Sequence, residues 1–182
     1  MQTNEKDIKD IKKFFNSYSK GFSSIYTEDD QSRSMFNKLI DKWFRKAVYR
    51  RYEITLSETQ KDSINSVLDV GCGPGHHTIA FLHQGKEVTA LDVADEMVDL
   101  TKEKVAKFNS NASCKYIVSD YMTHSFDEQF DAICVMGFFD YVSDPVTVLK
   151  KLLSEARKEI YISIPNEKGL LGLQRRIRYW LK

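Results

Sequence analysis

The chain has 182 residues, of which 42% are hydrophobic and 29% charged, and it carries a formal net charge of +1 at pH 7. This length supports one sizeable core with an appendage, and the composition is that of a soluble globular protein rather than a disordered or membrane-spanning one. Because 27 basic residues nearly cancel 26 acidic ones, no overall field attracts nucleic acid, and we expect none to bind. The N-terminal residues lack the apolar run of a secretory signal, so we expect a cytoplasmic protein.

The first 58 residues are rich in aromatic and charged side chains. Apolar residues recur at helical spacing in residues 6–19 and again in residues 32–56, which predicts two amphipathic helices. We therefore divide the chain into an N-terminal helical segment, 1–58, and a core, 59–182.

From residue 66 onward, short apolar runs alternate with amphipathic stretches, which is the pattern of βαβ units. The expected strands cover residues 67–70, 88–91, 116–118, 132–136 and 160–164. The expected helices cover residues 76–84, 95–108 and 145–157. Right-handed crossovers place helices on both faces, so we predict an α/β, Rossmann-like, doubly wound and mostly parallel sheet. Ligands of such sheets bind beyond the carboxyl ends of the strands.

Three cysteines, Cys72, Cys114 and Cys134, are spread through this region without a Cys-x-x-Cys pair. Their odd number and spacing argue against a disulfide framework or a thiolate zinc site, and we expect no metal. Buried small apolar side chains are the more ordinary role for free cysteines in strands.

A glycine loop follows the first expected strand, with Gly71, Gly73 and Gly75 allowing the backbone to pass close to a ligand. The helix behind the loop offers free N–H groups and the positive end of its dipole. A dinucleotide site requires a glycine three residues after the second one. His76 stands there instead, so the dinucleotide fingerprint fails.

The stretch Val67-Leu68-Asp69-Val70-Gly71-Cys72-Gly73-Pro74-Gly75 resembles motif I of the class I S-adenosylmethionine (SAM) dependent methyltransferases. The resemblance covers about residues 60–165. It implies SAM as the cofactor, S-adenosylhomocysteine (SAH) as the product, and a sheet of strand order 3-2-1-4-5.

The resemblance also implies roles for single residues. Asp92, at the end of the second strand, would hold the ribose hydroxyls, and Asp120 would accept from the adenine amino group. The implied cofactor contacts are Asp69, Gly71, Gly73, Gly75, Asp92, Val93, Met97, Asp120, Tyr121 and Met136. Two alternatives remain open: Val93 and Met97 serve only ordinary helix packing, and Asp120 caps the turn that follows it.

Methyl transfer needs a nucleophile held in line with the methyl group, so positioning can supply most of the catalysis and a general base is optional. For a hydroxyl acceptor, the side chains able to take the proton are His76, His77, His124, Asp140 and Tyr141. A histidine near a glycine loop is more often structural than a base. We retain His124, Asp140 and Tyr141 as candidates, and the sequence does not choose among them.

A weaker likeness joins both ends of the chain to the magnesium-protoporphyrin O-methyltransferase group. It rests on Lys12-Lys13-Phe14-Phe15-Asn16-Ser17 to Ile25-Tyr26, on Gly137-Phe138-Phe139-Asp140-Tyr141 to Asp144-Pro145, and on Ser163-Ile164-Pro165. That group methylates a carboxylate beneath a lid of N-terminal helices. The likeness implies that residues 1–58 form a lid, and the alternative is that they merely cover the sheet.

One departure from the superfamily concerns the C-terminus. The family sheet normally ends in a hairpin of two further strands, whereas here an amphipathic tail, residues 169–182, follows the fifth strand. We therefore expect the final hairpin to be absent, as in either a truncated chain or a short sheet. An open sheet edge would invite a homodimer, and the tail would lie on the sheet or, alternatively, on a membrane or partner.

We predict a SAM-dependent methyltransferase acting on a small molecule, with an oxygen acceptor favoured over nitrogen. The alternative is a non-catalytic binding module with the same fold, or a fragment that acts through a partner.

Overall fold

The computed structural model describes residues 8–13, 15–16, 48–108 and 112–164. The tail at 169–182 and most of the helix expected at 32–56 lie outside the described residues. Within the described ranges, no helix is both long and apolar enough to cross a membrane.

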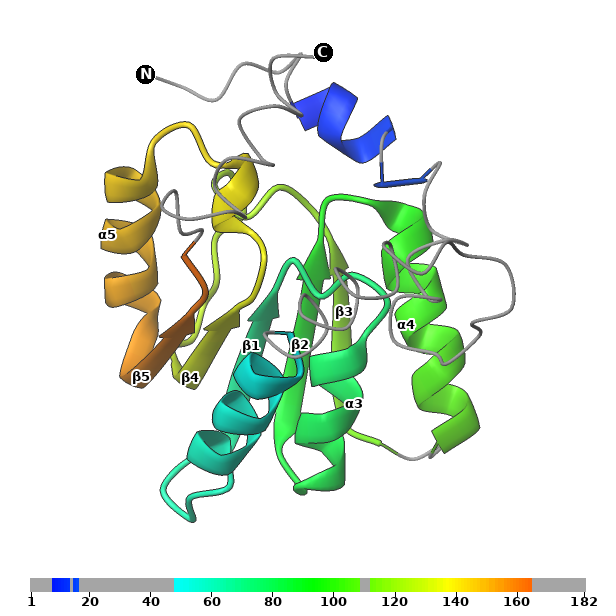
Figure 1. The fold of residues 1–182 in the computed structure, drawn as a ribbon, viewed down its shortest axis with the longest axis vertical. Helices are drawn as coiled ribbons and strands as arrows, with labels where there is room; N and C mark the ends of the chain where they lie inside the picture. The colour runs from blue at the N-terminus through cyan, green and yellow to red at the C-terminus, as the bar shows by residue number, and fades with distance from the viewer. Residues whose placement is uncertain (1–7, 14, 17–47, 109–111, 165–182) are drawn as a thin grey trace, which may run out of the picture.

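A five-stranded parallel sheet forms the centre of the molecule (Figure 1). Its strands are β1 (Ser66–Val70), β2 (Glu87–Asp92), β3 (Cys114–Val118), β4 (Phe130–Val135) and β5 (Ala156–Ile162). Their order is β3-β2-β1-β4-β5, and every neighbouring pair is parallel. The predicted doubly wound fold and strand order are therefore confirmed.

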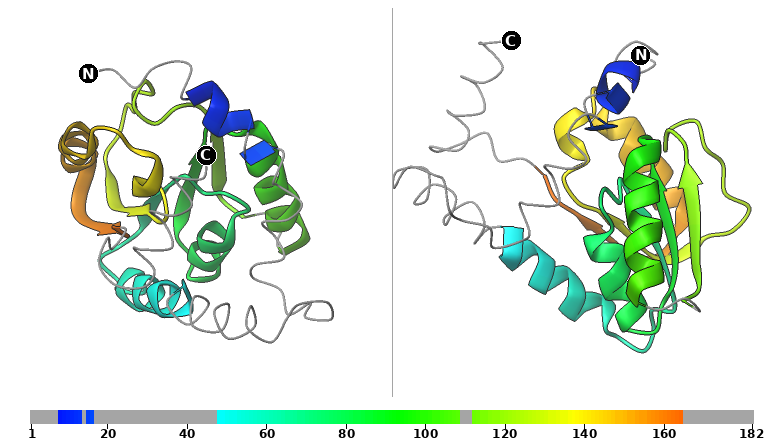
Figure 2. Two further views of the ribbon diagram at one scale, coloured as in Figure 1. Left: turned by 45° about the horizontal axis from the view of Figure 1, so that its top comes forward. Right: turned by 90° about the vertical axis from the view of Figure 1, so that its right-hand side faces the viewer.

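Helices cover both faces of the sheet (Figures 1 and 2). Helix α3 (His76–His83), helix α4 (Asp95–Phe108) and the helical residues 48–59 lie on one face, and α5 (Pro145–Glu155) lies on the other. Each strand contributes side chains to an apolar core on either face of the sheet, because successive side chains along a strand point to opposite faces. In β1, Val67 packs toward α3, and Leu68 packs toward α5. The three cysteines are free, with Cys72 and Cys134 buried.

The last strand begins earlier than the apolar pattern predicts, at Ala156 rather than at residue 160. The missed residues include Arg157 and Lys158, which look like helix or loop residues in the sequence. Both ion-pair with the buried Asp131 of β4, at 3.2 Å and 2.9 Å. The charged side chains that make the start of β5 hard to predict from the sequence thus form the ion pairs that hold it against β4.

Residues 8–13 and 15–16 are helical and lie above the carboxyl ends of the strands, where they are drawn in blue (Figure 1). The tilted view places the same helix over the end of the sheet (Figure 2). This is the edge at which the turn after β1 and the turn after β2 meet, so the N-terminal helix lies over the region where the sequence predicts a ligand.

Candidate functional site

The turn after β1 has a backbone that only glycine adopts easily. Gly71, Gly73 and Gly75 have φ angles of 69°, 52° and 77°, in the left-handed region. The amides of Gly71 and Cys72 both donate to the carbonyl of Leu91 in β2, at 2.8 Å and 3.0 Å. The turn is therefore fixed to the neighbouring strand and presents backbone rather than side chains.

Asp92 at the end of β2 links this turn to the start of α4. Its Oδ2 accepts from the Gly73 amide and its Oδ1 accepts from the Ala94 amide, each at 2.9 Å. Only 8% of the residue is exposed, and burial raises the pKa of its carboxyl against the lowering effect of these hydrogen bonds. Each carboxylate oxygen can accept more than one hydrogen bond, so Asp92 retains acceptor capacity for a bound hydroxyl.

Helix α4 also holds the glycine turn from the side. Thr101 Oγ1 donates to the Gly73 carbonyl at 2.8 Å, and Lys104 Nζ donates to the Pro74 carbonyl at 3.0 Å. Sequence reasoning missed both residues. Neither belongs to a motif, and no local pattern indicates that α4 packs on this turn.

Asp69 lies in β1 beneath the turn and is 2% exposed. Its Oδ2 accepts from the Thr78 hydroxyl of α3 at 2.7 Å. Burial, assisted by the charge of Asp92, raises the pKa of the Asp69 carboxyl to about 7, although the Thr78 hydrogen bond opposes this rise. The observed contact of Asp69 is structural, and its cofactor contact stays a prediction.

The apolar residues of the predicted cofactor set lie around the same edge. Met97 is 1% exposed within α4, as expected for core packing, and Val93 is half-buried between β2 and α4. Met136 is half-buried immediately after β4 and packs against the core on the α3 side.

Asp120 and Tyr121, which follow β3, have different surroundings. Asp120 Oδ1 accepts from the Met122 amide at 3.0 Å, so the predicted alternative of a turn cap is present. Tyr121 is 1% exposed, and its hydroxyl donates to Glu155 of α5 at 2.6 Å. The Tyr121 side chain thus belongs to the core beneath α5, and the cofactor roles of both residues stay predictions.

The three candidate bases are not brought together. His124 lies along α5: its carbonyl accepts from Lys151 at 2.7 Å and its ring packs on Phe126, 4.6 Å away. Asp140 and Tyr141 instead lie in the short helix η2 (Phe139–Tyr141), just beyond β4. Only these two candidates are therefore placed near the carboxyl edge of the central strands.

The two histidines after the glycine turn are held as neutral groups. Burial, with a smaller effect of Lys104, lowers the pKa of His76 to about 4. Burial also lowers the pKa of His77 to about 4, with smaller effects of His76 and Arg51. The His77 ring packs edge-on against Tyr52, 5.1 Å away. Among the described residues, no group of His, Cys, Asp or Glu side chains is arranged to hold a metal ion.

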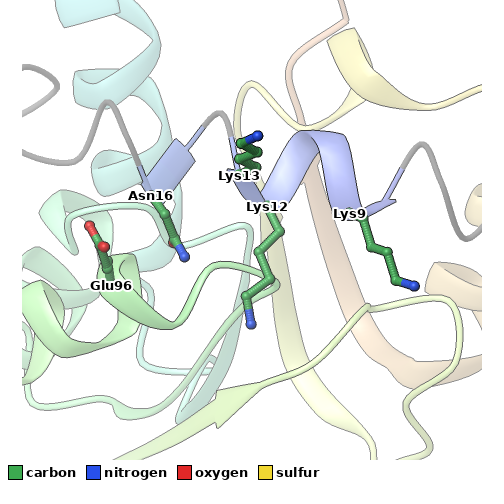
Figure 3. A pocket seen from close by; sticks show the side chains of 5 residues that line it. All are labelled: Lys9, Lys12, Lys13, Asn16 and Glu96. Atoms are coloured by element: carbon green, nitrogen blue, oxygen red, sulfur yellow. The ribbon is translucent and has the colours of Figure 1, made fainter.

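The N-terminal helix, residues 8–13 and 15–16, contacts the protein on both sides of the carboxyl edge of the sheet. Lys12 Nζ pairs with Asp95 Oδ1 at 3.2 Å, and Asn16 Nδ2 donates to the same oxygen at 2.9 Å. On the other side, the rings of Phe15 and Tyr141 meet edge to face, 5.2 Å apart. The helix therefore bridges the start of α4 and the turn after β4. An open cavity of about 460 Å³ lies beside it (Figure 3).

Comparison with known proteins agrees with this geometry. The chain is 27% identical over 124 residues to a probable cobalt-precorrin-6B C(15)-methyltransferase (decarboxylating) of Thermoplasma acidophilum, covering 66% of this chain and 61% of that protein. It is 35% identical over 95 residues to a ubiquinone biosynthesis O-methyltransferase of Xanthomonas campestris pv. campestris, covering 48% of this chain and 37% of that protein. The chain thus spans less than two thirds of the length of these relatives.

Among solved structures, the fold resembles magnesium protoporphyrin IX methyltransferase from Synechocystis PCC 6803 with bound SAH. The TM-score is 0.69 at 19% identity, covering 95% of this chain and 79% of that one. A family model described as a methyltransferase domain matches residues 67–158, just over half of the chain. The match includes the glycine turn, Asp92 and the strands that carry them, and the chain therefore belongs to the methyltransferase domain family, as the glycine loop predicts.

Proposed function

We propose that this protein binds SAM and transfers its methyl group to an oxygen of a small molecule. The observation that carries the proposal is the hydrogen bond from the Gly73 amide to Asp92 Oδ2, at 2.9 Å. It occurs in a chain that belongs to the methyltransferase domain family. In this arrangement a buried acceptor carboxylate lies directly beside a turn in which Gly71 and Gly73 are partly exposed. A ligand with ribose hydroxyls at one end and a charged amino-acid group at the other matches such a pair of surfaces.

The residues around the turn fit this cofactor. A Cβ at Gly73 would meet no atom within 4 Å, so the turn has space on that side for a bound group. Asp92 would accept from the ribose hydroxyls, and the glycine backbone of the turn would lie against the methionine part. SAM supplies a methyl group on a positively charged sulfur, which makes the methyl carbon electrophilic. The role of the chain is then to hold the acceptor atom in line with that carbon.

An oxygen acceptor is favoured by the names of the relatives, among which O-methyltransferases recur. An acceptor hydroxyl must lose its proton when the new bond forms. Asp140 and Tyr141 are the candidate bases that support this step, because η2 follows β4 at the carboxyl edge. His124, which packs along α5, is a weaker candidate.

The N-terminal helix would act as a lid in this function. The contacts at Asp95 and at Tyr141 support this role, because they hold the helix on opposite sides of the site. Excluding water there would strengthen electrostatic interactions inside and prevent loss of the reactive methyl group.

Two measurements test the proposal. Calorimetry with SAH reports cofactor binding, and the absence of binding at millimolar SAH would refute it. Transfer of labelled methyl from SAM to panels of hydroxylated and carboxylated small molecules, compared with matched amines, then reports turnover and the acceptor atom. Binding without transfer to any panel member would support the non-catalytic module instead.

A further inference from the structure

Three lysines lie among the five residues that border the cavity beside the N-terminal helix, and the apolar parts of their side chains contribute much of its surface. Its lining consists of Lys9, Lys12, Lys13, Asn16 and Glu96. Lys9, Lys12 and Asn16 extend from the helix toward the loops beneath it, whereas Lys13 extends the other way (Figure 3). Glu96 belongs to the first turn of α4, four residues after Asp92. The cavity therefore adjoins the predicted cofactor site and is bounded by the proposed lid.

The charges in the cavity are unevenly paired. Lys12, which lies between Lys9 and Glu96 in Figure 3, pairs with Asp95, the residue before Glu96, at 3.2 Å. Lys9 lies at the opposite end from Glu96 (Figure 3). Among the described residues, no carboxylate forms an ion pair with Lys9. Lys9 is thus an exposed lysine without an ion-pair partner among the described residues.

We infer that this cavity receives an anionic group of the methyl acceptor, a carboxylate or a phosphate, with Lys9 as its main partner and Lys12 as a second. This inference rests on the proposed function and names the class of its substrate. A cation on a closing helix strengthens its attraction to an anion as water leaves, because the effective dielectric constant falls. An acidic acceptor would then help to hold the lid shut.

The anionic group would be an anchor rather than the reacting oxygen. An ammonium group that donates to an oxygen withdraws the lone pair needed to attack the methyl carbon. The lysines therefore suit a second group on the acceptor, which fixes its orientation while the nucleophilic atom lies closer to the glycine turn. The acceptor class is a molecule with an acidic group and a separate nucleophilic oxygen.

Titration of the full chain with two simple anions, succinate and inorganic phosphate, tests the site by two-dimensional amide NMR. With SAH present at saturation, we expect saturable shifts at residues 9, 12, 16 and 96. Absence of saturable shifts at these residues up to 50 mM anion would overturn the inference. Anion binding that SAH abolishes would also overturn it, because the cavity would then hold the carboxylate of the cofactor.

Charge variants identify the residue responsible. Lys9→Gln removes one partner of an exposed ion pair, so we expect the anion dissociation constant to rise about two- to fivefold. Lys150→Gln, which removes an exposed lysine of α5, is the matched control and should leave that constant unchanged. Equal effects of the two variants would refute a specific site. Calorimetry with SAH separates the two proposals. If Lys9→Gln leaves the affinity for SAH unchanged, its effect on anion binding belongs to the acceptor site and not to the cofactor site. If the unmodified protein does not bind SAH, the proposed function itself is refuted.

Discussion

A Cβ atom on Gly75 would lie 2.7 Å from both Cγ2 and Oγ1 of Thr101, the residue that also donates to the Gly73 carbonyl. The glycine turn and α4 are thus in contact so closely that no side chain fits between them. Gly75 also has a φ of 77°, which is costly for any other residue.

Gly75→Ala is therefore expected to lower the free energy of unfolding by roughly 2–5 kcal/mol, combining the left-handed backbone with overpacking. Gly85→Ala is the matched control, because Gly85 has a φ of 73° but nothing within 4 Å of its Cβ position. That variant should cost only about 1–2 kcal/mol. Urea unfolding of both variants measures the difference, and equal losses would show that the contact with Thr101 adds nothing.

Asp92→Ala is expected to weaken SAH binding about 10- to 100-fold, since hydrogen bonds to a charged group contribute about 1.5–3 kcal/mol. The SAH affinity of Asp92→Asn should lie between those of the unmodified protein and Asp92→Ala. The amide keeps one acceptor oxygen, whereas the carboxylate accepts from the amides of both Gly73 and Ala94. Calorimetry provides the affinities. Asp99→Ala, which removes an exposed carboxylate of α4, is the control. Unchanged affinity in Asp92→Ala would remove this residue from the cofactor site.

The parts of the site that the sequence predicts are those with a short, fixed spacing. Gly71, Gly73 and Gly75 follow a strand directly, and Asp92 falls one helix and one strand later. The parallel sheet then brings the ends of β1 and β2 together, whatever the remaining residues are. This is why the fold, the strand order and the glycine turn can be predicted from the sequence.

The remaining contacts depend on pairs distant in sequence and without a motif. Nothing near Tyr121 indicates that its hydroxyl reaches Glu155, and nothing near Asn16 indicates Asp95. The early start of β5 is hidden for the same reason, because Arg157 is apparent as a strand residue only once Asp131 is known to lie beside it. Side-chain partners across the fold are set by packing, which local patterns do not encode.

Asp95→Ala is expected to loosen the proposed lid, because it removes the partner of both Lys12 and Asn16. Solvent screens this exposed ion pair, so amide exchange in residues 8–16 should accelerate only modestly, up to about fivefold. Mass spectrometry of that peptide gives the rate, with β1 as an internal reference that should not change. Asp99→Ala breaks an exposed pair with Lys102 on the same helix and should leave the peptide unaltered. If the peptide exchanges at the same rate in the unmodified protein, Asp95→Ala and Asp99→Ala, the contacts of Asp95 do not hold the N-terminal helix in place.

Asp69 makes the stability of the fold depend on pH. Its folded pKa of about 7 lies above the ordinary value of 3.8, so the folded state binds its proton more tightly than the unfolded state does. The stabilising contribution of the protonated carboxyl is fully present below pH 4 and is lost as the pH rises through 7. Asp69→Asn removes this titration while its amide oxygen can still accept from Thr78.

The variant should therefore gain stability relative to the unmodified protein between pH 4 and 7, by a total of about 4 kcal/mol. Only the slope is diagnostic, because burying an amide adds a constant offset at every pH. Asp144→Asn is the control: hydrogen bonds from the side chain and amide of Thr147 lower the pKa of Asp144, so its contribution changes only at more acidic pH. Urea unfolding at several pH values gives both curves. If the stability curves of Asp69→Asn and the unmodified protein run parallel, the Asp69 carboxyl is already ionised at pH 4. Its pKa is then not raised by burial beneath the glycine turn, and the prediction is wrong.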